Sequence, residues 1–410
     1  MNVCVIGMGK IGIPLAVQFA SKGARVTGYD IDAARVADLH AHRNPLPAEP
    51  GLEEAIPRLA ALGLLRATSD PCAAAAAADV VVFIVPVDID IAHKPDFTLL
   101  DAAVDAISPH IRGGTLVLVE TTVPVGTTRR RIGPRLPHAA VAFSPERVSS
   151  GSVLRDLATY PKIVGGIDAG STERARAFYA AMLDAPVLVV RDAETAEFSK
   201  LAETTYRDVN IALANEFARI ADAAGVDALE AIAAANTQPY SHIHRPGPGV
   251  GGHCIPVYPY FLDPAETGLI AGARRTNDAM AAYAVARLAG VLGGLDGAVC
   301  VVLGLAYRAG VKESRHSSTF GLVDALAAAG ATACVHDPLY SADEIRAEGL
   351  TPAPAFPVPA DALVVQAWHA QYHDLDFRQF AGLRAVLDTR SALDPAAVRS
   401  LGLHYVGIGR

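Results

Sequence analysis

The chain has 410 residues, of which 51% are hydrophobic and 19% charged, and its formal net charge is −8. This length is enough for two or three domains, each with its own core. The acidic balance argues against general electrostatic binding of nucleic acid, although a local cationic pocket for a phosphate ligand stays open.

Five cysteines are present, an odd number without paired spacing, and the sequence has no CxxC motif or Cys/His cluster that predicts a metal site. This usage favours a reducing cytoplasm. The N-terminus has no signal-peptide pattern, and its apolar run at residues 3–6 is far too short to cross a bilayer. We therefore expect a cytoplasmic protein with no metal, membrane or nucleic-acid partner.

The first half of the chain alternates short apolar runs with helical patterns. Continuous apolar strands between helices predict a parallel sheet covered on both faces. The strand candidates are residues 2–7, 25–30, 79–86, 115–120 and 139–145.

The first strand, turn and helix, VCVIGMGKIGIPLA, carry Gly7, Gly9 and Gly12 in the spacing GxGxxG. Gly7 would allow the tight turn, Gly9 the close approach of a pyrophosphate, and Gly12 close packing of helix and strand. The helix N-terminus offers free N–H groups to the phosphates, so Lys10 and Ile11 complete the predicted site.

Asp30 ends the next predicted strand. Its carboxylate can accept hydrogen bonds from the adenosine ribose, and its charge would repel a 2′-phosphate, which favours NAD over NADP. The alternatives are a glycine-rich turn without a ligand and an FAD site, for which the sequence gives no other signal.

A long helical pattern covers residues 193–224, and Gly225 is a natural stop. Such a length suggests a spine between two domains. More helical sequence follows to about residue 290, interrupted by the loop PGPGVGGHCIPVYPYFL (246–262). The α/β pattern then returns, with strand candidates at 298–307, 331–338, 362–368 and 384–390. We therefore predict an α/β fold of two Rossmann-like parallel-sheet domains joined by a long central helix.

Seven ordered motifs span nearly the whole chain: EPGLEE (49–54), ETTVPVGTT (120–128), SPERV (144–148), PKIVGG (161–166), YRDVNIALANE (206–216), PGPGVGGHCIP (246–256) and VLGLAY (302–307). Together they resemble the UDP-glucose/GDP-mannose dehydrogenase family. The branch that looks closest contains the UDP-N-acetyl-mannosamine and UDP-N-acetyl-glucosamine 6-dehydrogenases.

The resemblance implies an NAD-binding Rossmann domain at residues 1–190 and a UDP-sugar-binding α/β domain at 291–410. Between them, residues 191–290 would form a central helical region that carries the cysteine loop and builds a homodimer. The family reaction oxidises the C6 alcohol of a sugar to a carboxylate with two NAD.

Cys254 matches the family nucleophile. An aldehyde gives up a hydride with difficulty, whereas its thiohemiacetal can do so and leaves a thioester that water hydrolyses. A lone cysteine is more often a small buried hydrophobe, but the surrounding motif favours the nucleophile. The other cysteines, expected to be structural, are Cys4, Cys72, Cys300 and Cys334.

The resemblance gives three more residues a catalytic role. Lys200 would stabilise the developing oxyanion and transfer protons, and burial near NAD⁺ could lower its pKa. Glu146 would handle water and protons, and Thr122 would hold an ordered water beside the cofactor. The structural alternatives are a solvated lysine, a loop carboxylate paired with Arg147, and a hydroxyl that caps a turn.

The chain departs from the family pattern at three positions. Tyr258 stands where the family has a carboxylate four residues after the cysteine, and Thr204 stands where it has an asparagine four residues after the lysine. Tyr240 occupies the place of an arginine that reaches the partner subunit's substrate, and Arg245 could substitute for it. A phenol with a pKa of about 10 cannot replace a carboxylate base at neutral pH.

The expected substrate site lies in the C-terminal part. Arg308 and Arg315 match cationic positions of the family's nucleotide-sugar site, Arg390 is a weaker match, and Tyr260 is a further candidate. Guanidinium groups suit a diphosphate because they donate two parallel hydrogen bonds, whereas surface ion pairs are the alternative. Gly304 stands alone in the first βα turn of this part, so we expect no second dinucleotide there.

The leading hypothesis is an NAD-dependent nucleotide-sugar 6-dehydrogenase that converts a UDP-hexose or a UDP-N-acetylhexosamine to the uronic acid through a Cys254 thioester. Because Thr204 and Tyr258 replace polar partners of the reaction, a diverged two-electron dehydrogenase with an altered product is the first alternative. The second is a protein that binds NAD and nucleotide sugar without catalysis.

Overall fold

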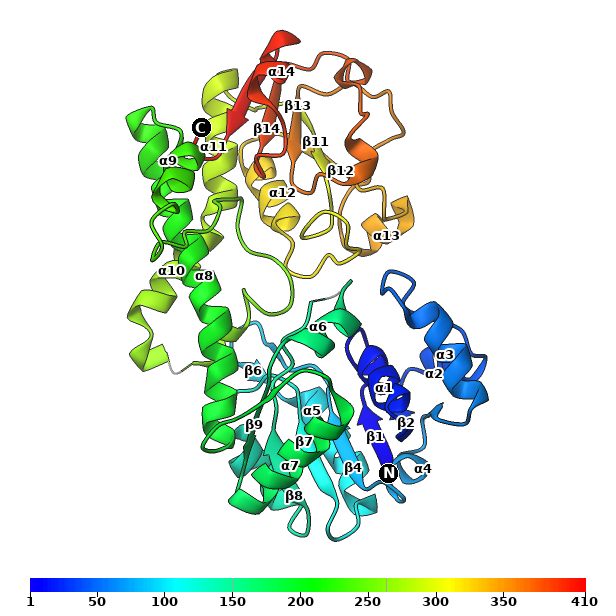
Figure 1. Ribbon diagram of the computed structural model, residues 1–410. Coiled ribbons are helices and arrows are strands. Elements are labelled where there is room, and N and C mark those ends of the chain that lie inside the picture. Colours follow the sequence, from blue (N-terminus) through cyan, green and yellow to red (C-terminus); the bar gives the residue numbers. More distant parts are fainter. Residues whose placement is uncertain (150, 263) are drawn as a thin grey trace. The chain divides into compact units, whose positions relative to one another are not determined.

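The computed structural model describes residues 1–149, 151–262 and 264–410 (Figure 1). These residues form two compact units. The first contains residues 1–203 and 260–262, and the second contains residues 204–259 and the remainder of the described chain.

The first unit is built on an eight-stranded sheet with the order β10-β9-β8-β7-β4-β1-β2-β3. Its strands are β1 (Asn2–Ile6), β2 (Arg25–Tyr29), β3 (Leu65–Thr68), β4 (Val80–Phe83), β7 (Leu116–Val119), β8 (Ala140–Phe143), β9 (Lys162–Gly166) and β10 (Val187–Val189). All neighbouring strands are parallel except β8 and β9, which are antiparallel. A small antiparallel hairpin joins β5 (Asp88–Ile89) to β6 (Pro95–Asp96).

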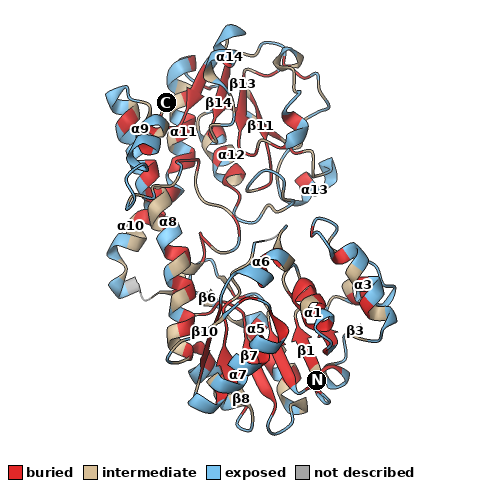
Figure 2. Cartoon of the chain, viewed as in Figure 1, coloured by how far each residue is buried: buried red, intermediate tan, exposed pale blue. Residues whose placement is uncertain are grey.

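Helices cover this sheet, and several of them form a hydrophobic core with its strands. They are α1 (Gly12–Ser21), α2 (Ala33–His40), α3 (Leu52–Ala61), α4 (Pro71–Ala75), α5 (Thr98–Ile107), α6 (Val153–Thr159) and α7 (Ala169–Met182). The central strands β4 and β7 are buried along their whole length (Figure 2). Each buried valine, leucine or phenylalanine side chain of this kind contributes about 1.5–3 kcal/mol.

Helix α8 (Ala193–Ala224) has 32 residues and ends at Gly225, whose φ is 69°. Both the helix and its glycine stop agree with the prediction from sequence. The helix begins among residues of the first unit and ends among those of the second.

The second unit contains a five-stranded, fully parallel sheet with the order β12-β11-β13-β14-β15. Its strands are β11 (Val299–Leu303), β12 (Thr332–His336), β13 (Ala362–Val365), β14 (Ala385–Asp388) and β15 (His404–Gly407). Its helices besides α8 are α9 (Ala228–Ala235), α10 (Gly268–Asp278), α11 (Met280–Leu292), α12 (Ser318–Ala328), α13 (Ala342–Ala347) and α14 (Pro395–Ser400).

The predicted fold class is confirmed, and every strand candidate contains a strand of the structure. In the described parts of the chain, no helix has both the length and the apolar content of a membrane span.

Candidate functional site

The turn after β1 has the backbone geometry of a phosphate-binding turn. Gly7 has a φ of 97°, which favours glycine, and a Cβ on Gly12 would overlap the Gly7 carbonyl oxygen. A Cβ on Gly9 would meet nothing within 4 Å, so this residue borders open space through which a pyrophosphate can approach the backbone. Lys10 and Ile11 follow at the start of α1, whose N-terminus has no side-chain cap in the described structure.

Asp30 lies beside this turn and is 8% exposed. Its Oδ2 accepts hydrogen bonds from Met8 N (2.8 Å) and Arg35 Nη1 (3.0 Å), and its Oδ1 accepts one from Asp32 N (2.9 Å). Arg35 also pairs with Asp32 at 3.2 Å. Because two carboxylates share one guanidinium, the pocket keeps a negative charge, which disfavours a 2′-phosphate.

Glu146 is held by the backbone and not by the arginine next to it. Its Oε1 accepts the N–H groups of Arg147 (2.7 Å) and Val148 (3.1 Å), and its Oε2 lies 2.9 Å from Lys162 Nζ. The Arg147 side chain instead donates to Glu203 Oε2 at 2.6 Å. The alternative of a simple Glu146–Arg147 ion pair is therefore wrong.

Lys200 is 6% exposed, so it is not a solvated surface lysine. Its Nζ lies 3.7 Å from Glu203 Oε1, and Glu203 in turn binds Arg147. Within the first unit, Lys200 and Glu146 are thereby linked through Glu203 and Arg147, because the Arg147 side chain pairs with Glu203 and its backbone N–H donates to Glu146. Thr122, after β7, is also buried, at 6% exposure.

In the second unit, the glycine-rich loop that carries Cys254 is fixed by close backbone contacts. Gly252 has a φ of 92°, and its N–H donates to the Arg315 carbonyl at 2.9 Å. A Cβ on Gly251 would lie 2.7 Å from Tyr307 Cβ. His253 Nε2 lies 2.9 Å from Glu313 Oε2. The loop is thus attached to the segment that carries the predicted substrate arginines.

A buried polar ladder supports the start of the same loop. Asn215 Oδ1 accepts the N–H of Gly247 (2.8 Å), and Asn215 Nδ2 donates to Asn277 Oδ1 (2.9 Å). Asn277 Nδ2 and Arg274 Nη1 both donate to Asp208 Oδ1, at 2.9 and 2.6 Å. These four residues were not among those predicted from the sequence. The signal was present in YRDVNIALANE, where Asp208 and Asn215 are seven residues apart and share one helix face.

Tyr258 lies against the candidate nucleophile. The Tyr258 N–H donates to the Cys254 carbonyl at 3.0 Å, so the chain makes one helical turn, and the Cys254 thiol lies 3.7 Å from Tyr258 Oη. Cys254 is partly exposed. By contrast, burial raises the pKa of the Cys4 and Cys300 thiols to about 12, which makes them poor nucleophiles.

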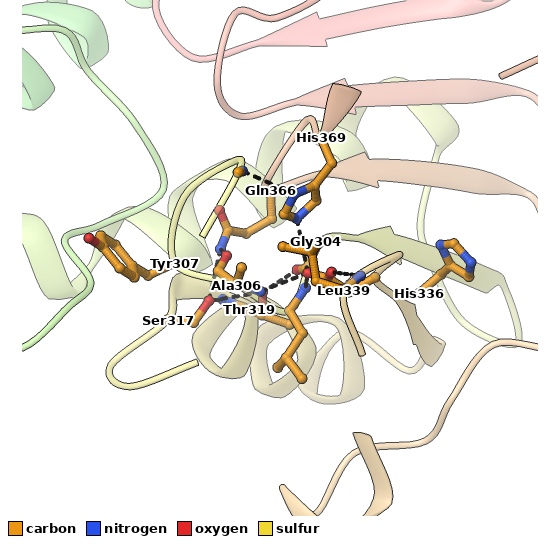
Figure 3. Close-up of polar contacts among 12 residues, drawn as sticks. Gly304, Ala306, Tyr307, Ser317, Thr319, His336, Leu339, Gln366 and His369 are labelled. Carbon is orange, nitrogen blue, oxygen red and sulfur yellow. Dashed lines mark hydrogen bonds and ion pairs between the residues drawn. The ribbon is translucent and has the colours of Figure 1, made fainter. Parts of the chain in front are cut away.

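Backbone N–H groups of the turn after β11 donate hydrogen bonds to a buried aspartate, which a histidine also contacts (Figure 3). Asp337 Oδ2 accepts the N–H groups of Leu305 (2.8 Å) and Ala306 (2.9 Å) and a hydrogen bond from His369 Nε2 (3.1 Å). His369 Nδ1 accepts the Gly310 N–H, which assigns the ring proton to Nε2. Burial raises the pKa of Asp337, but these hydrogen bonds outweigh it and hold the pKa below its usual value.

Arg390 is the least exposed of the predicted substrate arginines. Its Nε donates to the Gln366 carbonyl at 2.8 Å, and its Nη2 donates to Gln366 Oε1 at 2.9 Å. Among the described residues its hydrogen bonds go to carbonyl and amide oxygens and not to a carboxylate. Burial lowers its pKa to about 10, which still leaves the guanidinium charged at neutral pH. Its Nη1 would lie 3.3 Å from a Cβ on Gly247.

The other predicted substrate residues differ in their exposure and in the unit to which they belong. Arg308 is exposed and donates to Tyr307 Oη at 2.9 Å, and Arg315 is exposed. Arg245 is exposed, and the Tyr240 side chain is 88% exposed. Tyr260 belongs to the first unit, where its ring contacts that of His93 with centroids 4.4 Å apart.

The chain matches three domains of one protein family. Residues 1–183 match the NAD binding domain of the UDP-glucose/GDP-mannose dehydrogenase family, residues 194–278 match its central domain, and residues 301–395 match its UDP binding domain.

Several relatives are similar over nearly the full chain. The UDP-N-acetyl-D-mannosamine dehydrogenase of Methanocaldococcus jannaschii is 34% identical, with 96% of this chain and 93% of that protein covered. The NDP-N-acetyl-D-galactosaminuronic acid dehydrogenase of Ralstonia nicotianae is 34% identical, with 95% of each covered. The solved UDP-D-ManNAc dehydrogenase of Pyrococcus horikoshii superposes with a TM-score of 0.89 at 32% identity and covers 100% of this chain and 99% of that one. The chain therefore belongs to the UDP-glucose/GDP-mannose dehydrogenase family and is an NAD-dependent nucleotide-sugar dehydrogenase.

Proposed function

We propose that the protein oxidises the C6 alcohol of a UDP-sugar to the uronic acid, with two NAD consumed per sugar. The observation that carries this proposal is the environment of Cys254, a partly exposed thiol in a loop of the second unit that backbone hydrogen bonds hold in place. Two of the relatives are named for N-acetyl-D-mannosamine and N-acetyl-D-galactosaminuronic acid. A UDP-N-acetylhexosamine is therefore the first substrate to test.

NAD would be held by the turn of Gly7, Gly9 and Gly12 and by Asp30, and when bound it supplies the hydride acceptor. Lys200 would stabilise the alkoxide that forms when the alcohol loses its proton, and departure of a first hydride from C6 to this acceptor would leave the aldehyde. The Cys254 thiolate would then add to the aldehyde carbon, forming the C–S bond of a thiohemiacetal.

Loss of a second hydride leaves a thioester on Cys254. Glu146 would accept a proton from water, the hydroxide would attack the acyl carbon, and the C–S bond would break to return the thiolate. Thr122 would position this water. Because the nucleophile must stay reduced, the reaction suits a reducing compartment such as the cytoplasm.

In this proposal the nucleotide diphosphate binds the second unit. Arg390 carries a partly buried positive charge whose hydrogen bonds, among the described residues, go to neutral oxygens, and Arg308, Arg315 and Arg245 lie on exposed segments where they can close on phosphates. Tyr260 would contact the sugar. The proposal divides the chain into an NAD domain at 1–190, a central dimerisation region at 191–290 and a UDP-sugar domain at 291–410.

A second candidate is a two-electron dehydrogenase that stops at the aldehyde. The contact between Cys254 and Tyr258 favours it, because a neutral phenol stands where a carboxylate could take up the proton of hydrolytic water. A protein that binds both ligands without turnover is the remaining alternative.

The stoichiometry of NADH decides among these candidates. Purified protein is incubated without oxygen with NAD and UDP-N-acetylhexosamines, and the product is identified by mass. Two NADH per sugar and an acid support the proposal, whereas one NADH and an aldehyde support the second candidate. The variant Cys254→Ser should release no acid, and full acid formation by that variant would exclude the thioester.

A further inference from the structure

A cluster of ionisable side chains lies behind Glu146, at one edge of the first sheet. Glu120 follows the last residue of β7, Glu146 follows β8, and Lys162 is the first residue of β9. Because β9 is antiparallel to β8, its first residue lies at the same edge as the ends of β7 and β8. The reversed strand is therefore what brings Lys162 to the two carboxylates.

The contacts within the cluster are short and shielded from water. Lys162 Nζ lies 2.7 Å from Glu120 Oε2 and 2.9 Å from Glu146 Oε2. Tyr179 Oη donates to Glu120 Oε1 at 2.6 Å, and the Lys162 ammonium lies 5.0 Å from the centroid of the Tyr179 ring. The exposed fractions of the side chains are 0% for Glu120, 5% for Lys162 and 10% for Glu146.

Charge counting favours one retained carboxyl proton in this cluster. Two carboxylates face a single ammonium, so full ionisation would bury one uncompensated negative charge, which is costly. Burial raises the pKa of Glu120 to about 7. Burial acts on Glu146 in the same direction, but Lys162 and the hydrogen bonds outweigh it and hold its pKa below the usual value.

The other charged groups around Glu146 already have partners. Arg147 and Asp156 line a small cavity together with Glu146 and Lys162. Arg147 pairs with Glu203 at 2.6 Å, and Asp156 pairs with Arg155 at 2.8 Å. Glu120 is therefore the group through which the charge of the cluster can change near neutral pH.

We infer that Glu120 is a positioning residue that, through the shared ammonium of Lys162, controls how strongly Glu146 binds a proton. This inference rests on the proposed role of Glu146 in hydrolysis. When Glu120 is protonated, Lys162 neutralises Glu146 alone and leaves it a weak base. When Glu120 loses its proton, the second negative charge competes for Lys162 and makes Glu146 a stronger base.

The test uses the full-length protein and the variant Glu120→Gln, which keeps one of the two acceptor oxygens that Tyr179 and Lys162 bind but cannot ionise. For the wild type we expect kcat to rise through an ionisation near pH 7. In Glu120→Gln this rise should disappear, and kcat above pH 8 should fall about 3- to 10-fold, well short of the roughly 10²- to 10⁴-fold loss when a general base is removed. KM should stay unchanged.

Two further variants separate this role from a structural one. Tyr179→Phe removes a hydrogen bond that favours the ionised Glu120, so the rise in kcat should move to higher pH. Glu49 is a matched buried carboxylate that accepts the N–H groups of Gly151 and Val153. Glu49→Gln should keep the wild-type pH profile of kcat.

An NMR titration without substrate tests the inference independently of the proposed function. Protein labelled with ¹³C at the glutamate carboxyl carbons should show one resonance that titrates near pH 7 and is absent in Glu120→Gln. If that resonance is present but no sugar nucleotide is oxidised, the proposed function fails and the ionisation of Glu120 stands. If no carboxyl titrates near pH 7, or Glu120→Gln keeps the wild-type pH profile, the inference is overturned. Should Glu120→Gln not fold, an unshifted profile in Tyr179→Phe overturns it equally.

Discussion

Among individual residues, Tyr258 separates this chain most clearly from the family pattern described above. Its hydroxyl lies 3.7 Å from the Cys254 sulfur because one helical turn separates the two residues. A phenol can donate a hydrogen bond to a thiolate, whereas a carboxylate at the same place would repel it. The substitution therefore favours formation of the nucleophile and removes a base for later steps.

Two substitutions of Tyr258 test whether its hydroxyl stabilises the Cys254 thiolate. The measurement is the rate at which iodoacetamide alkylates Cys254. Tyr258→Phe removes the hydrogen-bond donor, and alkylation at pH 7 should slow by about 10- to 100-fold, since hydrogen bonds to charged groups contribute about 1.5–3 kcal/mol. Tyr258→Asp introduces a like charge and should slow it at least as much. Tyr260→Phe, two residues later and in contact with His93, should alkylate at the wild-type rate. Equal rates in all variants would show that Oη does not act on the sulfur.

At the level of elements, the glycine-rich loop depends on a helix far from it in sequence. Asn215 on α8 is fully buried, accepts the Gly247 N–H and donates to Asn277 on α10. The loop has no regular structure of its own before the turn at residues 258–261. Its shape is thus set by side chains of α8 and α10.

Removing this anchor should destabilise the protein measurably. Asn215→Ala leaves the Gly247 N–H and part of the Asn277 amide without partners in a buried place, which costs about 1–3 kcal/mol each. Asn210→Ala is the matched control, because Asn210 lies on the same helix and also makes two hydrogen bonds to the chain before the loop, but at a partly exposed position. Urea unfolding should show a clearly lower free energy for Asn215→Ala than for Asn210→Ala. Equal values would mean that water replaces the buried contacts.

The sequence predicted the regular elements that follow simple patterns. The long helix and the apolar strands of both sheets were recognised because their periodicity is strong over many residues. It did not reveal β3, β9, β10 or β15, whose short or glycine-containing runs give weak periodicity. Nor could it reveal that β9 is reversed, because strand direction depends on tertiary pairing.

The same limit applies to the candidate site. The glycine turn and Asp30 were predictable because the strand, turn and helix are contiguous in sequence. Lys162 was not, because only the reversed strand β9 brings it to Glu120 and Glu146, and Tyr179 was not, because it reaches Glu120 from α7. Their roles become visible through distances and burial and not through spacing.

For the whole molecule, α8 exposes an apolar row that a single chain leaves in water. Tyr206, Leu213, Phe217 and Ile220 are 55%, 42%, 38% and 63% exposed, and their spacing of seven, four and three residues puts them along one side of the helix. Such a row typically marks an interface. It supports the proposed homodimer, whose two-fold symmetry would pair the row with itself.

Light scattering after gel filtration tests that assembly. The wild type should have twice the mass of one chain, and Leu213→Glu combined with Ile220→Glu should give single chains, because four like charges would be placed in one interface. Leu401→Glu changes another exposed leucine, at 55% exposure, and should leave the dimer intact. A dimer in the double variant would place the interface elsewhere.

Asp337, which accepts hydrogen bonds from the turn after β11, has a counterpart in Asp30, and this likeness bears on the ancestry of the chain. Gly7 and Gly304 have φ angles of 97° and 108°, and each starts a turn whose next amide is bound by the aspartate that ends the neighbouring strand, Asp30 or Asp337. This is the pattern that duplication of one ancestral half would leave. Asp30 still reaches the surface, whereas His369 has closed over Asp337. With Asp337 sealed, the carboxylate of the second turn is closed to the ribose hydroxyls that Asp30 could bind.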